Sequence, residues 1–141
     1  MKKTLIKSSD FQKYYRQLIL KKIGVGGQKK ILKGKVLVIG AGGLGCPLIL
    51  YLAYSGVGNL GIVDHDKIEL SNLSRQVLFT RKDIGKYKTS VSKKAAKKIN
   101  NKTIVETFTH KIDRTNINKI AKDYPIICDG TDNFESRFLI N

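Results

Sequence analysis

The chain has 141 residues, 41% of them hydrophobic, which is enough for one domain with a packed core. Its apolar runs stay well short of the roughly 20 residues that a membrane-spanning helix needs, and its N-terminus makes a poor signal peptide, so we expect a cytoplasmic protein with no membrane partner. The two cysteines, Cys46 and Cys128, lie in apolar segments and form no C-x-x-C pair, a pattern typical of reduced core thiols and not of a zinc site.

The formal net charge is +16, and residues 81–102 contain nine lysines or arginines against a single aspartate. Such an excess favours an anionic partner, for example nucleic acid or an acidic protein. The alternative is a solvated helix surface in a lysine-rich protein. We favour this alternative because no aromatic side chains interleave the lysines of residues 88–102 to form a stacking platform.

Residues 1–10 are expected to form a flexible N-terminal arm, and Ser8, Ser9 and Asp10 at its end are N-cap candidates for a first helix. Apolar side chains then recur at helical spacing up to a stop at Gly24, and they share one stripe: Phe11, Tyr14, Tyr15, Leu18 and Ile19. Arg16 falls off this stripe and points away from the surface that the helix buries. The Gly-rich segment 24–27 breaks the chain before a short second helix over residues 28–33.

The rest of the chain alternates short apolar strands with helices. Strands are expected at 35–39, 60–64, 103–109 and 126–128, helices at 43–56, 88–100, 115–123 and from 131 onward, and an irregular polar loop at 66–87. This alternation predicts an α/β fold, a Rossmann-like parallel sheet with helices on both faces. Ligands of such sheets bind beyond the carboxyl ends of the strands. Gly40, Asp64 and the segment 129–132 should therefore meet at one crevice.

The glycine loop G-x-G-G-x-G lies between the strand at 35–39 and the helix that follows it. Glycines at positions 40, 42, 43 and 45 permit a tight turn and let a phosphate approach the backbone, while the helix start offers free N–H groups. The loop therefore predicts a nucleotide site. The alternative is a glycine turn that only packs the helix against the strand.

Asp64 ends the second strand 24 residues after Gly40, close to the spacing at which an acid binds the ribose of a dinucleotide. An NAD-binding dehydrogenase is therefore one hypothesis. The polar side chains that follow favour a more highly charged triphosphate instead; they are Asp66, Asn72, Arg75, Gln76 and Lys88. Asp132 is a candidate ligand of the magnesium ion that accompanies a triphosphate. It could also cap the last helix together with Glu135, as in a capping box.

Several motifs occur in register over most of the chain. They are Tyr15-Arg16-Gln17-Leu18-Ile19-Leu20, Gly40-Ala41-Gly42-Gly43-Leu44-Gly45, Gly56-Val57-Gly58, Asp64-His65-Asp66, Leu70-Ser71-Asn72-Leu73-Ser74-Arg75-Gln76, Gly85 with Lys88, and Asp129-Gly130-Thr131-Asp132-Asn133. Together they resemble the MoeB/ThiF family, relatives of the ubiquitin-activating enzymes, from about residue 11 to residue 141.

The resemblance implies an enzyme that uses ATP and magnesium to adenylate the C-terminal glycine of a ubiquitin-like sulfur-carrier protein ending in Gly-Gly. Pyrophosphate leaves, and the product serves molybdopterin or thiamin biosynthesis. Matched by motif, the catalytic residues are Arg16, Arg75, Lys88 and Asp132, with Asp132 on magnesium and Arg16 reaching into the other subunit of a homodimer. The nucleotide-binding residues are Gly40, Gly42, Gly43, Gly45, Asp64, Asp66, Asn72, Arg75, Gln76 and Lys88, of which Asp64 binds the ribose.

Family members continue beyond the point that corresponds to Asn141. We therefore expect residues 11–141 to be an ATP-binding adenylation domain that is incomplete at its C-terminus, cut after the nucleotide-binding half. The groove for the carrier tail, the acceptor cysteine and the zinc site of many relatives are absent from this sequence. Two alternatives stay open, an ATP-dependent tRNA-modifying dehydratase of the same superfamily and an inactive nucleotide-binding fragment. His65 and His110 are expected to be surface or packing residues.

Overall fold

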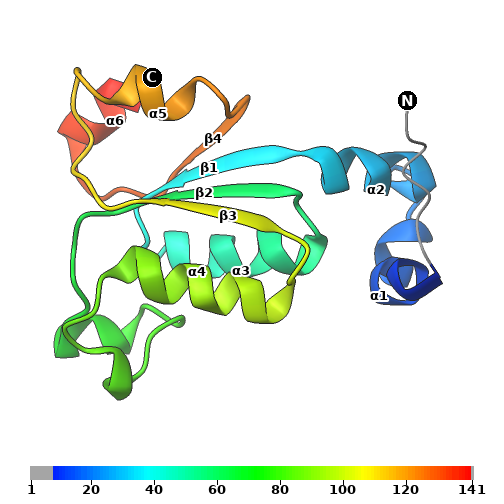
Figure 1. Ribbon diagram of the computed structural model, residues 1–141, viewed down its shortest axis with the longest axis horizontal. Helices are drawn as coiled ribbons and strands as arrows, with labels where there is room; N and C mark the ends of the chain where they lie inside the picture. The colour runs from blue at the N-terminus through cyan, green and yellow to red at the C-terminus, as the bar shows by residue number, and fades with distance from the viewer. Residues whose placement is uncertain (1–7, 141) are drawn as a thin grey trace.

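A computed structural model describes residues 8–140 of the chain (Figure 1). Residues 1–7 and Asn141 lie outside the described residues, and with them most of the expected N-terminal arm. The last part of that arm is helical, because α1 spans Ser8–Leu18. Among the described residues, no helix combines the length and the apolar character needed to cross a membrane.

The centre of the fold is a parallel sheet of four strands in the order β3-β2-β1-β4. The strands are β1 (Lys35–Ile39), β2 (Asn59–Val63), β3 (Ile104–Phe108) and β4 (Ile126–Asp129). In this register Val36 of β1 lies beside Leu60 on one side and Ile126 on the other. The apolar run at 35–39 is thus the interior strand that its composition predicts, buried on both faces from Val36 to Ile39.

Helices cover both faces of the sheet, which confirms the expected Rossmann-like architecture (Figure 1). Helices α3 (Gly45–Ser55) and α4 (Lys88–Ile99) lie on one face, and α5 (Ile117–Ala121) and α6 (Phe134–Ile140) on the other. Helix α2 (Gly24–Lys33) leads into β1, and together with α1 it lies beyond the amino ends of the strands.

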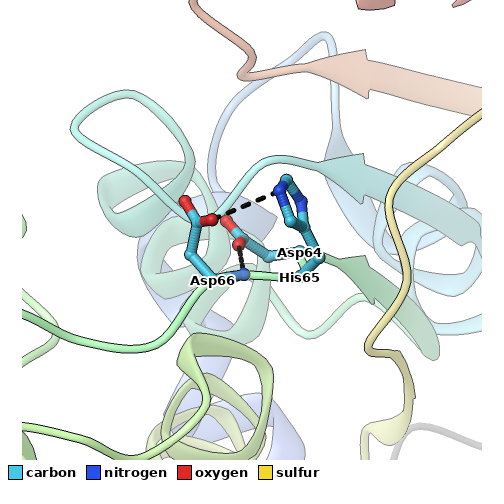
Figure 2. Close-up of side chains that lie close together, drawn as sticks. All are labelled: Asp64, His65 and Asp66. Carbon is cyan, nitrogen blue, oxygen red and sulfur yellow. Dashed lines mark hydrogen bonds and ion pairs between the residues drawn. The ribbon is translucent and has the colours of Figure 1, made fainter.

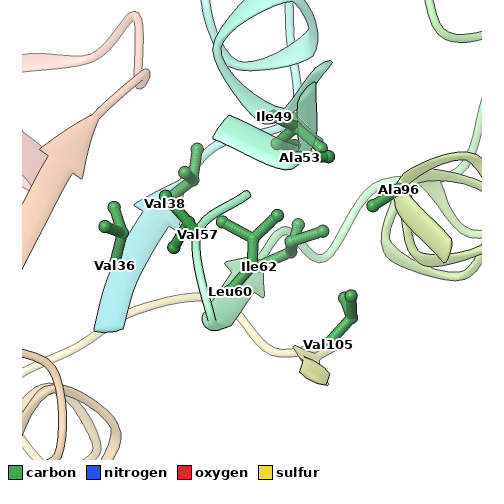
Figure 3. Packing of buried hydrophobic residues seen from close by; sticks show 10 residues of the cluster. Val36, Val38, Ile49, Ala53, Val57, Leu60, Ile62, Ala96 and Val105 are labelled. Carbon is green, nitrogen blue, oxygen red and sulfur yellow. The ribbon is translucent and has the colours of Figure 1, made fainter. Parts of the chain in front are cut away.

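The core has two layers because successive side chains of a strand point to opposite faces. Val36 and Val38 of β1 pack with Ile49 and Ala53 of α3 and with Ala96 of α4 (Figure 3). On the opposite face, Leu37 and Ile39 pack with residues of α5 and the turn after it: Ile117, Ile120 and Tyr124. Burying each large aliphatic side chain contributes about 1.5–3 kcal/mol, so the alternation along β1 fastens both helical layers to one strand.

The N-terminal helices differ from the sequence expectation in three ways. Gly24 begins α2, with a φ of +55°, so the segment 24–27 is the first turn of this helix and not a break. Among the α1 residues whose burial the structure describes, Tyr14 alone is buried, whereas Phe11, Tyr15 and, just after the helix, Ile19 are about half exposed. The apolar spacing predicted a helix here, but the expected stop at Gly24 is wrong, because α1 ends at Leu18. The spacing also could not tell how much of the stripe is buried.

The segment 66–87 is folded, although no regular element was expected there. It contains two short 3₁₀ helices, η1 (Leu70–Ser74) and η2 (Arg81–Asp83). Ile68 and Phe79 are buried against Cys46 in a small core of their own. The base of the segment is closed by an antiparallel bridge between Lys67 and Tyr87, and by a 2.9 Å hydrogen bond from Ile68 N–H to the Lys86 carbonyl. The loop is therefore a fixed wall beside the carboxyl ends of the strands.

Candidate functional site

A cavity of about 500 Å³ lies at the carboxyl ends of the strands, where the sequence places it. It brings together most of the predicted site residues, which are Gly40, Gly42, Gly43, Asp64, Asp66, Asn72, Arg75, Gln76, Lys88 and Asp132. Gly45 and Arg16 do not line it. Gly45 packs beneath the loop, and Arg16 is exposed on α1, beyond the opposite ends of the strands.

The four glycines of the loop fall into two pairs. Gly40 has a φ of +89°, and a Cβ there would lie 2.9 Å from the backbone of Gly130. A Cβ on Gly45 would lie 1.8 Å from the Gly40 carbonyl oxygen. The fold itself thus requires these two glycines, whereas the nearest atoms to a Cβ on Gly42 or Gly43 are side-chain atoms at 3.8 and 3.7 Å. Glycine at 42 and 43 leaves room toward the cavity, which packing of a helix on a strand does not explain.

The start of α3 brings the positive end of a helix dipole to the same region. The helix has no side-chain cap at Leu44 and no acidic residue in its first turn. Cys46 N–H donates to the Gly42 carbonyl at 2.9 Å, and Pro47 has no N–H, so what this end of the helix offers is the positive end of its dipole. An anion is the partner that such a terminus favours.

Asp64 ties the glycine loop to the next wall of the cavity. Its Oδ2 accepts a hydrogen bond of 2.8 Å from Ala41 N–H, and its Oδ1 accepts one of 2.8 Å from Asp66 N–H (Figure 2). The residue is only 9% exposed. A carboxylate oxygen accepts more than one hydrogen bond, so Asp64 retains acceptor capacity toward the cavity.

Lys88 is a buried cation in the cavity wall. Its Nζ lies 2.9 Å from Asp66 Oδ2, and its side chain is 7% exposed. The second oxygen of Asp66 lies 3.3 Å from His65 Nε2 (Figure 2). Possible metal-ligand atoms of Asp64, His65 and Asp66 fall within 4.8 Å of one another. Backbone amides and Lys88 engage both carboxylates, however, so the cluster is explained without a metal ion.

The folded loop supplies three polar side chains from η1 and the residues after it. Asn72 is buried, and its Oδ1 accepts a 3.0 Å hydrogen bond from Glu69 N–H. Arg75 is exposed and donates through Nη1 to the Ser71 carbonyl at 3.3 Å. Gln76 is 3% exposed, and its Oε1 has no hydrogen-bond partner within the described residues. A buried acceptor beside a cavity requires a donor, and a bound ligand is one source.

The segment between β4 and α6 forms the next wall. Asp129 accepts hydrogen bonds from Thr131 N–H at 2.8 Å and from Thr131 Oγ1 at 2.6 Å, which fixes the turn. Asn133 Oδ1 accepts from Ser136 N–H at 2.8 Å and caps α6. The capping alternative for Asp132 is therefore wrong, because its neighbour takes that role. Asp132 is exposed in the cavity wall.

Several cavity residues were not predicted. His65 and His110 are exposed, as expected for surface residues, but both line the cavity, as do Lys111 and Arg137. His110 and Lys111 follow the carboxyl end of β3, so the strand-end rule that selected Asp64 would have found them. Arg137 lies in α6 and donates to the Thr131 carbonyl at 3.2 Å, a placement that no sequence signal indicated.

Both cysteines are free, within the part of the chain that the structure describes. Cys46 is fully buried, and its Sγ donates a 3.3 Å hydrogen bond to the Ala41 carbonyl. Burial raises the pKa of its thiol to about 11, and burial also raises the pKa of Cys128. Neutral, poorly accessible thiols of this kind support the expected structural role.

Residues 14–141 match the model of the ThiF family. The chain is 46% identical over 132 residues to a probable molybdopterin-synthase adenylyltransferase of Gracilaria tenuistipitata var. liui, covering 94% of this chain and 37% of the relative. It is 39% identical to a sulfur carrier protein adenylyltransferase of Thermus thermophilus, covering 94% of this chain and 49% of the relative.

Among solved structures, E. coli tRNA N6-threonylcarbamoyladenosine dehydratase in complex with ATP shares the fold, with a TM-score of 0.89 at 20% identity. The likeness covers 96% of this chain and 56% of that one. The chain spans about a third to a half of the length of the curated relatives it matches. With the motifs in register and the family model matched from Tyr14 to the last residue, the chain belongs to the ThiF family.

Proposed function

We propose that the chain forms the nucleotide-binding part of an enzyme that adenylates the C-terminal glycine of a ubiquitin-like sulfur carrier. The observation that carries this proposal is the placement of Arg75 and Gln76 beside the glycine loop: a Cβ on Gly42 or Gly43 would meet only these polar side chains, at 3.8 and 3.7 Å. Two glycines without a packing reason beside two polar side chains are what a polyphosphate requires. The names of the curated relatives support adenylyl transfer as the reaction.

ATP suits the cavity better than a dinucleotide does. Arg75 offers a planar fork of donors for phosphate oxygens, and Lys88 offers a compact point charge. Gln76 Nε2 lies nearest to Gly42, where an amide N–H donor suits a phosphate oxygen. Asp64 retains acceptor capacity for a ribose hydroxyl, which is the role that the family resemblance assigns to it.

Asp132 is the residue that would hold magnesium. Mg²⁺ in phosphate sites commonly binds one or two carboxylates, with phosphate oxygens and water completing its coordination. An exposed carboxylate in the cavity wall meets that need. A bound ion would supply positive charge against the phosphates of the substrate.

The proposed step needs little chemistry from the protein itself. A carboxylate oxygen of the carrier's terminal glycine attacks the α-phosphorus of ATP, the bond to the bridging oxygen breaks, and pyrophosphate leaves with that electron pair. No proton has to move. Arg75 and Lys88 align the reacting anions and offset the charge that develops on the phosphate oxygens. Arg16 does not line the cavity of its own chain, so we assign it to the site of a second subunit in a homodimer.

The names of two relatives, both probable molybdopterin-synthase adenylyltransferases, favour molybdopterin biosynthesis over thiamin biosynthesis as the setting. The likeness to the tRNA dehydratase, at 20% identity, extends to the fold alone and offers no support for a tRNA substrate.

The lysines of α4 suit a solvated face, since Lys93, Lys94, Lys97 and Lys98 are all exposed.

The test is ATP–pyrophosphate exchange by the purified chain with magnesium and a sulfur carrier ending in Gly-Gly. We expect the chain to bind ATP, and we expect Arg75→Ala and Asp132→Ala each to weaken that binding about ten-fold or more. Exchange would show that these residues alone assemble the adenylation site. Arg81→Ala is the matched control, because it removes an exposed arginine of the same loop that does not line the cavity.

ATP binding without exchange would agree with a nucleotide-binding part whose carrier groove is supplied elsewhere. Absence of both would refute the proposal. Equal ATP affinity in all variants would refute the assignment of Arg75 and Asp132 to the site.

A further inference from the structure

Lys88 occupies a position that is electrostatically unfavourable. It is the first residue of α4, where the helix dipole is positive and where carboxylates are normally preferred. Its side chain is also 7% exposed, so water does little to stabilise the charge. A buried cation at the positive end of a helix needs an anion close by.

Asp66 supplies that anion and is held in place to do so. Its Oδ2 lies 2.9 Å from Lys88 Nζ, and its backbone carbonyl accepts a 3.0 Å hydrogen bond from Lys88 N–H. The bridge between Lys67 and Tyr87 continues this pairing of the two strands of chain. His65 Nε2 lies 3.3 Å from the other Asp66 oxygen (Figure 2). The carboxylate is thus oriented by two residues, Lys88 and His65, before any ligand binds.

A carboxylate in a phosphate site would repel the ligand if it faced the phosphates alone. Because the Asp66 carboxylate pairs with Lys88, it has a different role in the cavity. We propose that Asp66 is a positioning residue, which holds the Lys88 ammonium in the cavity wall and does not itself bind the nucleotide. This inference rests on the proposed function, because it assumes that the cavity takes ATP, and it replaces the direct nucleotide contact that the motif suggested for Asp66.

A double-mutant cycle on the ATP dissociation constant tests the inference. With Lys88 present, Asp66→Ala should weaken ATP binding by about ten-fold, because the ammonium is no longer held in the wall. In a Lys88→Met background the same change should alter the dissociation constant by less than about two-fold. Asp123→Ala is the matched control, since it removes an exposed acid that does not line the cavity.

An equal loss in both backgrounds would overturn the inference, because Asp66 would then act on the nucleotide directly. No loss with Lys88 present would overturn it as well. If Asp66→Ala does not fold, the same cycle with Asp66→Asn decides, since this variant removes the charge at constant size.

A second measurement does not depend on ATP, so it separates this inference from the proposed function. Brief treatment with acetic anhydride, followed by peptide mass spectrometry, reports how accessible each lysine amine is. Asp66→Ala should raise the acetylation of Lys88 several-fold relative to the exposed Lys93 and Lys94. Unchanged acetylation of Lys88 would show that Asp66 does not hold it. Failure of ATP to bind the unaltered chain would instead refute the proposed function and leave this result standing.

Discussion

Gly45 lies directly against the carbonyl group of Gly40, so closely that a Cβ on Gly45 would stand 1.8 Å from the carbonyl oxygen. The first residue of α3 therefore touches the residue that follows β1, and the glycine loop is folded tightly enough to bring the helix against the end of the strand. Gly43, in the middle of the loop, has no such neighbour. The two glycines should respond differently to the same substitution.

Gly45→Ala should destabilise the fold by about 3 kcal/mol or more, because the added methyl group meets rigid backbone. Gly43→Ala should change the free energy of unfolding by less than about 0.5 kcal/mol, since its nearest neighbour atom would be Arg75 Cδ at 3.7 Å. The same variant should nevertheless weaken ATP binding by about ten-fold. Urea unfolding and ATP titration of both variants check this, and a stable Gly45→Ala would contradict it.

Tyr14 should prove to be the anchor of α1. It is 1% exposed, and its hydroxyl oxygen accepts a 3.2 Å hydrogen bond from Asn100 Nδ2. Tyr14→Phe should cost about 1 kcal/mol, because Asn100 keeps its second acceptor, the Ala53 carbonyl at 3.3 Å. Tyr14→Ala should cost about 4 kcal/mol. Chemical denaturation measures both values, and Phe11→Ala, on the half-exposed face of the same helix, should cost much less.

Asp83 should contribute to the loss of folding stability at acid pH. Hydrogen bonds from Thr80, followed by one from Lys86, lower the pKa of its carboxyl from 3.8 to about 2. The folded state therefore favours the ionised form, so this stabilisation is complete above pH 3.8 and is lost as the pH falls toward 2. Asp83→Asn should thus reduce stability at pH 5 and much less at pH 2. An equal difference at both pH values would contradict this assignment.

Cys46 should be inert toward thiol reagents in the folded protein. Burial raises the pKa of its thiol to about 11, so it is neutral at pH 8. In a Cys128→Ser variant, which leaves Cys46 as the sole thiol, labelling by a disulfide reagent should be at least about 100-fold slower in buffer than in denaturant. Fast labelling under native conditions would mean that α3 opens readily.

The sequence was most informative where a local pattern and a fold rule agree. The apolar run at 35–39, the glycines after it and Asp64 at the next strand end follow from strand composition and the convergence of parallel strands. Lys88 has no local signal among so many lysines, and only the family motif singled it out. The structure brings it into the same cavity as the glycine loop, although the loop 66–87 lies between them in sequence.

The remaining features depend on contacts that no periodicity describes. Phe11, Tyr15 and Ile19 share a stripe with Tyr14, yet only Tyr14 finds the space beside Gly56. Asn133 caps α6 in place of Asp132, because the turn fixed by Asp129 delays the start of the helix. The burial of Tyr14 thus depends on a neighbour that is distant in sequence, and the cap of α6 depends on a one-residue shift in where the helix begins.

The hydrogen bonds of Asp64 have a consequence for the energetics of recognition. One carboxylate holds Ala41 of the glycine loop and Asp66 of the neighbouring wall at 2.8 Å each, so two sides of the cavity are joined before a ligand arrives. A preorganised cavity loses little conformational entropy on binding, which leaves more of the contact energy as affinity. Removing these two hydrogen bonds would weaken ligand binding because the empty cavity would be less ordered, even where no contact to the ligand is lost.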